Sequence, residues 1–416
     1  MPITSRGPTR WHELRGSRLG SWIGFAGAAC SLVAVFAASA SPIPLYEMYR
    51  RTDGLSHADL SLTAVAYFVA VMAALVVLGR LSNHLGRRPV ALAALVVTAV
   101  GTLVLTQVHS VGPLIAGRML QGIGCGLASS ALAAFIVDSA PTSPSWMASA
   151  VTTGSPMVGL TLGALVSGAL AEYGPAPRTL VYLVAAGVLF ACVILIVAAT
   201  ETVARAPGAR TALRPQVRVP AAARRLLPAA SATFVATWAL GGFYQAFGPS
   251  VAADQLGTTN TLIAAVIFAS LMAPSAIGAP LAGRTTPAGA QRIGILVFFA
   301  AVVAILLSLH AGAVVPFVIA SAVAGAAQGT TFAGSMRALL AEATAAERAG
   351  VLSAIYLISY GGAAIPGVIA GQLSRTLSLF DIALGYGALA ALACAVTLVA
   401  AREPRPTSPA EHPATA

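Results

Sequence analysis

Long apolar runs separated by short polar segments recur twelve times along this chain of 416 residues. Each run has about 20 residues, which is the length that a helix needs to cross roughly 30 Å of hydrocarbon. Only helices fit such runs, because every backbone polar group in lipid must find its partner within its own segment. The expected spans are residues 20–41, 60–78, 90–108, 113–137, 148–172, 179–199, 228–248, 260–281, 292–309, 314–336, 350–373 and 380–400.

The composition leads to the same all-α membrane protein. Hydrophobic residues make up 57% of the chain and charged residues only 9%, with a mean hydropathy of +0.84. Soluble chains carry about 25% charged residues. The composition therefore excludes a water-soluble globule, and almost nothing remains outside the spans to form a soluble domain.

All 24 basic residues are arginine, and this excludes several kinds of chemistry. Without lysine, neither a phosphate-binding loop of the Walker type nor a Schiff-base lysine can form. The four cysteines lie in apolar runs and the six histidines lie in loops or tails, without ligand spacing, so no metal or cofactor is expected. No paired catalytic constellation stands at membrane depth, and we therefore expect a gradient-driven protein and not an enzyme.

The distribution of arginines predicts how the chain is oriented. With the N-terminus inside the cell, nineteen arginines fall on the cytoplasmic side and four outside, and Arg118 lies within a span. This excess predicts a multi-pass protein of a bacterial inner membrane with both termini in the cytoplasm. The positive charge then faces anionic lipid, and nucleic acid is a poor alternative partner.

The chain divides into two halves that resemble each other. A six-span bundle at 1–199, which includes a cytoplasmic N-terminal arm, precedes a cytoplasmic linker at 200–227. A second six-span bundle at 228–401 and a disordered cytoplasmic tail at 402–416 follow. The pairs that match between the halves are Gln121-Gly122 with Gln328-Gly329 and Asp138 with Glu342. Such a repeat predicts two pseudo-symmetric bundles that enclose a cavity near the midplane.

Three motifs add a family resemblance. Residues 79–89 read GRLSNHLGRRP, residues 118–124 read RMLQGIG and residues 154–159 read GSPMVG. The first two motifs resemble the loop signature G-x-L-a-D-r-x-G-r-r and the R-x-x-Q-G-x-G pattern of the major facilitator superfamily. The third partly fits the glycine-proline motif of its drug/proton antiporter branch.

The resemblance implies a function as well as a fold. It implies a monomeric secondary transporter that works by alternating access and exports small amphipathic compounds or drugs against proton entry. The alternative is an uptake symporter or uniporter for a small organic anion, with Arg118 as the counter-charge. The family often carries a coupling carboxylate in its first span, which is absent here, so Glu47, Glu172 and Asp138 remain open candidates for that role.

The first motif suggests a gate at the inner ends of the spans. Arg87 can reach Asp138 at the end of the fourth span, and asparagine stands where the family normally has aspartate. The alternative is that the arginines only enforce topology. The gating candidates are Gly79, Asn83, Gly86, Arg87, Arg88 and Asp138.

Substrate-binding candidates are polar or aromatic side chains inside the spans. Arg118 and Gln121 share a helix face, and a polar stripe in lipid should point into the bundle. They contact substrate or, equally, brace the fold. For the others, packing is the alternative; they are Trp238, Tyr244, Gln245, Gln328, Tyr356 and Tyr360. Helix packing is expected at Gly154, Pro156, Gly159 and Gly163.

Overall fold

The computed structural model describes residues 9–141, 144, 146–215, 217–344 and 347–404, with side chains from residue 22 onward. This part of the chain is helical and contains no strand. The helices are α1 (Thr9–Ala40), η1 (Ile43–Leu45), α2 (Tyr46–Asp53), α3 (His57–Leu78), α4 (Ser82–Leu85), α5 (Arg87–Val104), η2 (Leu105–Gln107), α6 (Val111–Ser139), α7 (Met147–Tyr173), α8 (Pro177–Ala198), α9 (Ala209–Ala212), η3 (Ala222–Leu226), α10 (Leu227–Asp254), α11 (Thr261–Ser275), α12 (Gly278–Gly283), α13 (Pro287–His310), α14 (Val314–Ala341), α15 (Arg348–Leu373) and α16 (Leu379–Ala400).

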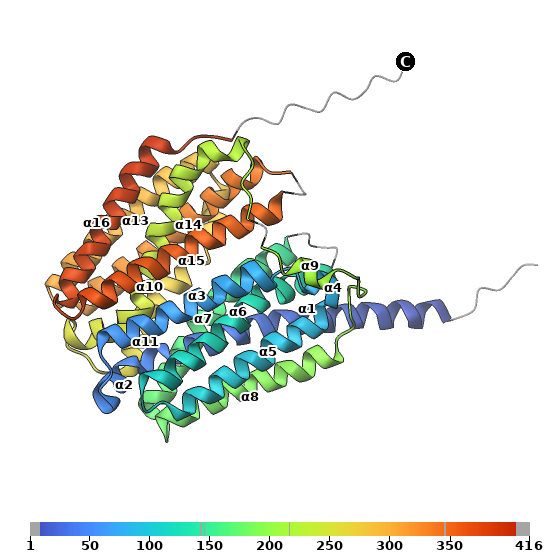
Figure 1. The fold of residues 1–416 in the computed structure, drawn as a ribbon, viewed down its shortest axis with the longest axis horizontal. Coiled ribbons are helices and arrows are strands. Elements are labelled where there is room, and N and C mark those ends of the chain that lie inside the picture. Colours follow the sequence, from blue (N-terminus) through green and yellow to red (C-terminus); the bar gives the residue numbers. More distant parts are fainter. Residues whose placement is uncertain (1–8, 142–143, 145, 216, 345–346, 405–416) are drawn as a thin grey trace, which may run out of the picture.

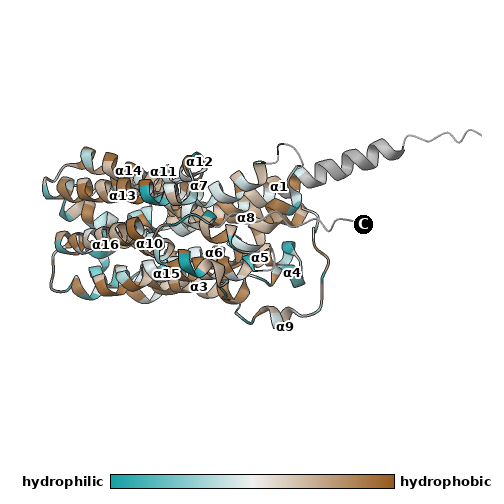
Figure 2. Cartoon of the chain, turned by 90° about the horizontal axis from the view of Figure 1, so that it is seen from above, coloured by the Kyte–Doolittle hydropathy of each residue, from teal (hydrophilic) through white to brown (hydrophobic). Residues whose placement is uncertain are grey.

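Among the described residues, twelve helical segments are long and apolar enough to cross a membrane, as the hydropathy pattern predicts. Hydrophobic residues cover the lengths of these helices and hydrophilic residues gather toward their ends (Figure 2). Many large apolar side chains are exposed on the outside of the bundle, such as Phe190 and Leu307, which suits a surface in contact with lipid. The chain is a multi-pass membrane protein.

The predicted end of the first span, at residue 41, coincides with a break in the helix. The segment from Trp22 to Asp53 is continuous in its course, but α1 ends at Ala40 and the chain continues through η1 into α2. Pro42 and Pro44 lack backbone N–H groups, so they cannot donate the hydrogen bonds that would continue the helix. The break exposes carbonyl groups at the end of α1, and these carbonyls become part of the site described below.

The two halves use the same small-residue contacts, as their sequence repeat predicts. In the first half, a Cβ atom added to Gly122 of α6 would lie 2.7 Å from the carbonyl oxygen of Tyr67 in α3. In the second half, a Cβ atom on Gly329 of α14 would lie 2.1 Å from the carbonyl oxygen of Ser275 in α11. Only glycine permits such close approach of two helix backbones in lipid.

The halves meet mainly through two helix pairs, α3 with α15 and α7 with α11. We call the end of the bundle that carries α4, α9 and η3 the linker face, and the end that carries α2 and the first residues of α3 and α11 the far face. The two halves lie close together toward the far face and diverge toward the linker face (Figure 1). The contacts that join them are therefore concentrated at the far face.

Hydrogen bonds to backbone carbonyls hold the middle of the linker against both halves. The guanidinium of Arg80 donates to the carbonyls of Thr211, Ala212 and Arg214, and the N–H of Arg218 donates to the carbonyl of Gly350 in α15. Only short helical turns form here, in α9 and η3, because Pro215 and Pro220 interrupt the pattern of arginines at every fourth position. Residues 405–416 of the predicted tail lie outside the described residues.

Candidate functional site

An aromatic cluster lies between the halves, near the middle of the helices. It consists of Phe68 of α3, Trp238 of α10, Phe332 of α14 and Tyr356 and Tyr360 of α15. The ring of Trp238 lies 4.5 Å from that of Tyr360 and 6.1 Å from that of Phe332. Tyr360 also lies 6.2 Å from Phe68, which is the member contributed by the first half, and 6.4 Å from Tyr356. Three of the predicted substrate-binding residues therefore come together at the interface between the halves.

The remaining predicted binding residues of the second half do not join this cluster through an observed contact. Tyr244 is buried within its own half, where its hydroxyl is 2.5 Å from that of Ser321 and its ring stacks on Phe317. Gln245 and Gln328 are placed in α10 and α14, and one buried amide atom of each lacks a hydrogen-bond partner among the described residues. Tyr244 thus serves packing in this conformation, while the two glutamines retain unused hydrogen-bonding capacity.

Arg118 and Gln121 of α6 point at the broken end of α1. The guanidinium of Arg118 donates to the carbonyl of Ser39 and, at 3.0 Å, to the amide oxygen of Gln121. The amide nitrogen of Gln121 donates to the carbonyl of Ala38 at 2.9 Å. The last carbonyls of a helix lack intrahelical partners and carry partial negative charge. The two side chains therefore bind carbonyls at the proline break, where the Ser41 hydroxyl also donates to the carbonyl of Ala38.

The surroundings of Arg118 explain how a charge is tolerated inside a span. The residue is fully buried, and its guanidinium lies over the ring of Tyr67 of α3, 4.1 Å from the ring centre. A cation at a helix C-terminus and over an aromatic face is stabilised by both contacts. Sequence reasoning offered neighbouring carbonyls and Gln121 as partners of Arg118 in its bracing alternative, but it did not identify Tyr67 or the end of α1 as the source of the carbonyls. The proline pair at 42 and 44 was the signal that could have pointed to them.

The gating candidates are assembled into one network at the linker face. Gly86 has a φ of 97°, which favours glycine, and this conformation turns the chain into α5. The guanidinium of Arg87 then donates to Asp138 at 2.9 Å, to Asn83 at 2.6 Å and to Ser82 at 2.8 Å. The asparagine thus retains a hydrogen bond to the arginine, as expected from its place in the motif. Gly79 ends α3 in a helical conformation, and Arg88 donates to the carbonyl of Val197 in α8.

Glu201 is a functional candidate that sequence reasoning missed. Its carboxylate accepts hydrogen bonds from the backbone N–H groups of Arg87 and Arg88, at 2.8 and 3.0 Å. These N–H groups begin α5, where a negative charge is stabilised by the helix dipole. The signal was an isolated acid at the end of the sixth span, beside the arginine-rich linker. Glu201 thereby joins α8 to the gating network.

All members of this network belong to the first half or to the start of the linker, and the contact between Arg87 and Asp138 is present while the halves diverge at this face. The contact therefore does not itself bridge the halves. In the second half, the residue equivalent to Asp138 is Glu342, which pairs with Arg225 at 2.7 Å. The repeat thus keeps the acid but takes its arginine from the end of the linker.

Asp138→Asn is expected to shift the balance between the two conformations about fivefold, because the Arg87 guanidinium then loses the one carboxylate that it contacts among the described residues, and a partly exposed ion pair contributes up to about 1 kcal/mol. The measurement is the labelling rate of cysteines introduced at the linker face. Arg284→Gln is the matched control, since it removes an exposed arginine from the corresponding loop of the second half. Equal labelling of Asp138→Asn and the unmodified protein would exclude a gating role for this contact.

Two of the four residues expected at helix packing lie where α7 closely approaches α1. Cβ atoms on Gly159 and Gly163 of α7 would lie 2.5 and 2.1 Å from the carbonyl oxygens of Val33 and Ala37 in α1. Gly154 has no described atom within 4 Å of the same position, so no close helix approach is present at this residue in this conformation. Pro156 lies inside α7, where its missing N–H interrupts the helix hydrogen bonds.

The acids considered for proton coupling at the far face both connect the halves. Glu47 is buried, accepts hydrogen bonds from Arg50 and Arg51, and lies 3.2 Å from the hydroxyl of Ser250 in α10. Glu172 of α7 accepts from the backbone N–H and the hydroxyl of Thr261 at the start of α11, at 2.8 and 2.9 Å. These carboxylates therefore help to seal the far face in this conformation.

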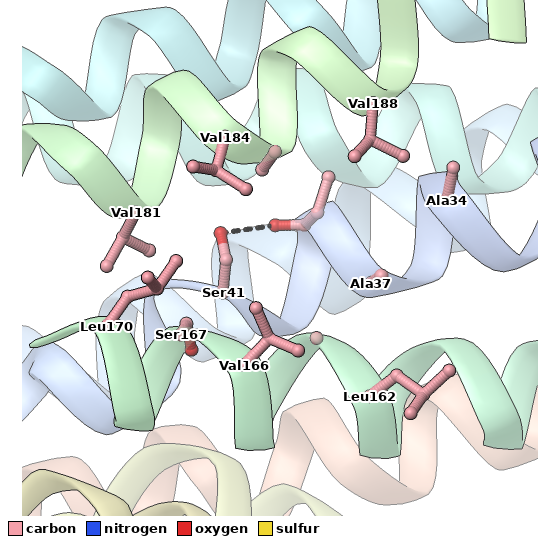
Figure 3. A pocket seen from close by; sticks show the side chains of 13 residues that line it. Ala34, Ala37, Ser41, Leu162, Val166, Ser167, Leu170, Val181, Val184 and Val188 are labelled. Atoms are coloured by element: carbon pink, nitrogen blue, oxygen red, sulfur yellow. Dashed lines mark hydrogen bonds between the residues drawn. The ribbon is translucent and has the colours of Figure 1, made fainter. Parts of the chain in front are cut away.

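Two hollows lie outside the aromatic cluster. One, of about 140 Å³, is lined by apolar side chains of α1, α7 and α8 (Figure 3) and opens among lipid-facing residues such as Leu162 and Val188, which suits an acyl chain better than a polar substrate. The other, of about 380 Å³, lies at the far face between the halves and is bordered by Glu47, Arg51 and Glu172. This second hollow belongs to the sealed far face.

Comparison with known proteins supports the family seen in the motifs. The model of the Major Facilitator Superfamily matches residues 25–367. Two relatives from strains of Klebsiella pneumoniae, both described as multidrug resistance protein MdtL, are 34% and 32% identical over 73 residues, which cover 18% of this chain and 19% of each relative. The chain thus matches only about a fifth of the length of these relatives.

Solved structures resemble the fold over nearly its whole length. A POT family transporter in complex with 5-aminolevulinic acid has a TM-score of 0.70 at 13% identity, covering 91% of this chain and 95% of that one. The peptide transporter POT in complex with alafosfalin has a TM-score of 0.69 at 15% identity, covering 91% and 93%. At such low identity the likeness establishes the fold alone.

Proposed function

Because this chain belongs to the major facilitator superfamily and is a membrane transporter, we propose that it exports small amphipathic compounds in exchange for protons. The two six-span halves would act as two bodies that expose one site alternately to each side of the membrane. The observation that carries this proposal is the aromatic cluster, which lies between the halves and draws its residues from both.

The chemistry of the cluster favours amphipathic compounds over small ions. Trp238, Tyr356 and Tyr360 offer flat apolar faces and polar edges, and ligand sites of this kind combine aromatic walls with few polar groups. The contacts of these rings with one another leave aromatic faces that would hold a cationic ligand. The partial likeness to the MdtL proteins supports the same class of substrate.

The arginine distribution supports one orientation of the protein in the membrane. We infer that the linker face lies in the bacterial cytoplasm, with both termini, since most arginines are on that side. The conformation described here would then be open toward the cytoplasm and sealed outside. This is the state in which an exporter takes up its substrate.

The alternative function, uptake of a small organic anion, has one observation in its favour. The Nε and Nη2 atoms of Arg118 have no hydrogen-bond partner among the described residues. Against it, Arg118 is fully buried behind the broken end of α1 in this conformation. An anion would have to open that contact to reach the guanidinium, which is why we place export first.

The test is transport in proteoliposomes with an imposed pH gradient. Accumulation of a fluorescent amphipathic cation that stops when the gradient is collapsed is the expected result. Gradient-independent movement of that cation, or transport of organic anions only, would contradict proton-coupled export. A matched preparation without protein measures the passive leak.

Trp238→Ala is expected to weaken the apparent affinity for an aromatic substrate about tenfold, because a stacked aromatic contact contributes roughly 0.5–1.5 kcal/mol beyond the buried area. The measurement is the substrate concentration at half-maximal transport. Phe190→Ala is the control, since Phe190 is an aromatic residue of α8 exposed on the outside of the bundle. Similar half-maximal concentrations for the two variants would show that the cluster does not bind the substrate.

A further inference from the structure

A cluster of charged residues connects the halves at the far face. Arg50 of α2 donates to Glu47 at 2.8 Å and to Asp254 of α10 at 2.9 Å. Arg51 donates to Glu47 at 2.7 Å. Glu47, Arg50 and Arg51 belong to the first half and Asp254 to the second, so the contact between Arg50 and Asp254 joins the two halves.

His57, the first residue of α3, lies beside this cluster but forms no hydrogen bond with it through Nε2. Its Nε2 atom is 3.3 Å from Asp254 Oδ2, yet this nitrogen has no hydrogen-bond partner among the described residues. The ring lies 6.5 Å from that of Phe247 in α10, and the side chain is 20% exposed. An unused imidazole nitrogen therefore lies at the boundary between the halves.

The charges around His57 are already balanced when its ring is neutral. The two carboxylates, Glu47 and Asp254, face two guanidiniums, Arg50 and Arg51. The helices that pack beside this end of α3 present apolar or small groups, namely Leu114 of α6 and Gly371 of α15. A proton on His57 would thus add a positive charge beside Arg50 in a half-buried place. The neighbouring acids are already engaged, Asp53 with Arg178 and Asp59 with Ser56 at the start of α3.

We propose that His57 is a proton-binding site of the far face and that its protonation opens the seal between the halves. When the halves part, the ring becomes hydrated and its charge is screened from Arg50, so the proton binds more favourably to the open form. By linkage, the proton then shifts the equilibrium toward that form. Histidine is suited to this role because its ordinary pKa is about 6.5.

This inference rests on the proposed alternating access and on the proposed orientation, in which the far face is the outside of the cell. Acidity on the side from which protons enter would then open the far face. Export would release its substrate on the side where the gradient is available, and the far face would remain sealed when the outside is not acidic. Carboxyl groups ordinarily have a pKa near 4, below the range in which a histidine responds.

The experiment measures the width of the far face directly and needs no substrate. Spin labels are attached to cysteines at Tyr173 and Val315, exposed residues near the far ends of α7 and α14 in opposite halves, after the four native cysteines are replaced by serine. Between pH 8 and pH 5.5 the ratio of long to short distances is expected to rise about tenfold. In His57→Gln it is expected to change less than twofold.

His310→Gln is the matched control, because His310 ends α13 near the far face, where it contacts Phe380 within its own half. This variant should keep the full pH response. A pH response retained in His57→Gln, or a shortening of the distance in acid, would overturn the proposal. If His57→Gln does not give a monodisperse protein, His57→Asn replaces it. Failure of the transport test with an intact pH response would refute the proposed export and leave the proton site standing.

Discussion

Arg118→Ala is expected to reduce transport to the background of empty liposomes and to lower the thermal stability of the purified protein. The substitution frees the carbonyl of Ser39 and the amide of Gln121 inside the bundle and leaves a cavity over the ring of Tyr67. Breaking a buried charged contact costs about 3–5 kcal/mol. Transport of a proton-driven substrate and the midpoint of thermal unfolding are the two measurements.

Arg118→Lys distinguishes a role of the positive charge from a role of the guanidinium hydrogen bonds in bracing the fold. Lysine keeps a cation at the end of α1 but lacks the planar fork that reaches Ser39 and Gln121 together. We expect partial recovery of stability and less recovery of transport. Arg375→Ala, which removes an exposed arginine after α15, is the control for loss of a guanidinium alone. Wild-type transport in Arg118→Ala would exclude both a bracing and a binding role.

Gly371→Leu is expected to hold the far face open and to abolish transport. A Cβ atom at this position of α15 would lie 2.9 Å from the Cβ atom of Ser61 in α3, and the Ser61 hydroxyl donates to the carbonyl of Gly367 at 2.6 Å. A leucine side chain forces the two halves apart along this contact. The distance between labels at Tyr173 and Val315 should become long at every pH.

Gly385→Leu provides the matched control for this substitution. Gly385 of α16 is exposed on the outside of the bundle, and a Cβ atom there would meet nothing within 4 Å. Transport and label distances should match those of the unmodified protein. A short distance in Gly371→Leu would mean that α3 and α15 can separate locally while the far face remains sealed by the other contacts.

The spans and their repeat could be predicted from the sequence because lipid enforces both. A helix must satisfy its own backbone and present apolar side chains over its whole length, so hydropathy alone located the twelve spans. Glycines at equivalent positions, Gly122 and Gly329, serve the same close approach in the two halves. These properties depend on residues close together in the chain.

The partners of the polar side chains could not be predicted in the same way. Sequence spacing placed Arg118 and Gln121 on one face of α6, but it could not reveal that this face meets carbonyls freed by prolines about 80 residues earlier. It also missed Glu201, whose carboxylate reaches the start of α5 more than 110 residues away. Gly154 is the first glycine of its motif, yet a Cβ atom at this position would meet no described atom within 4 Å.

The sequence by itself determined a twelve-span, two-half membrane protein with an arginine-rich linker face, since hydrophobic length and charge act locally along the chain. Only the tertiary structure decided which face is sealed and which side chains meet across the halves. Contacts such as Arg50 with Asp254 and Trp238 with Tyr360 depend on how separate helices cross, and helix crossing is set by side-chain packing over the whole bundle. For that reason His57 was only a loop histidine in the sequence and became a candidate proton site in the fold.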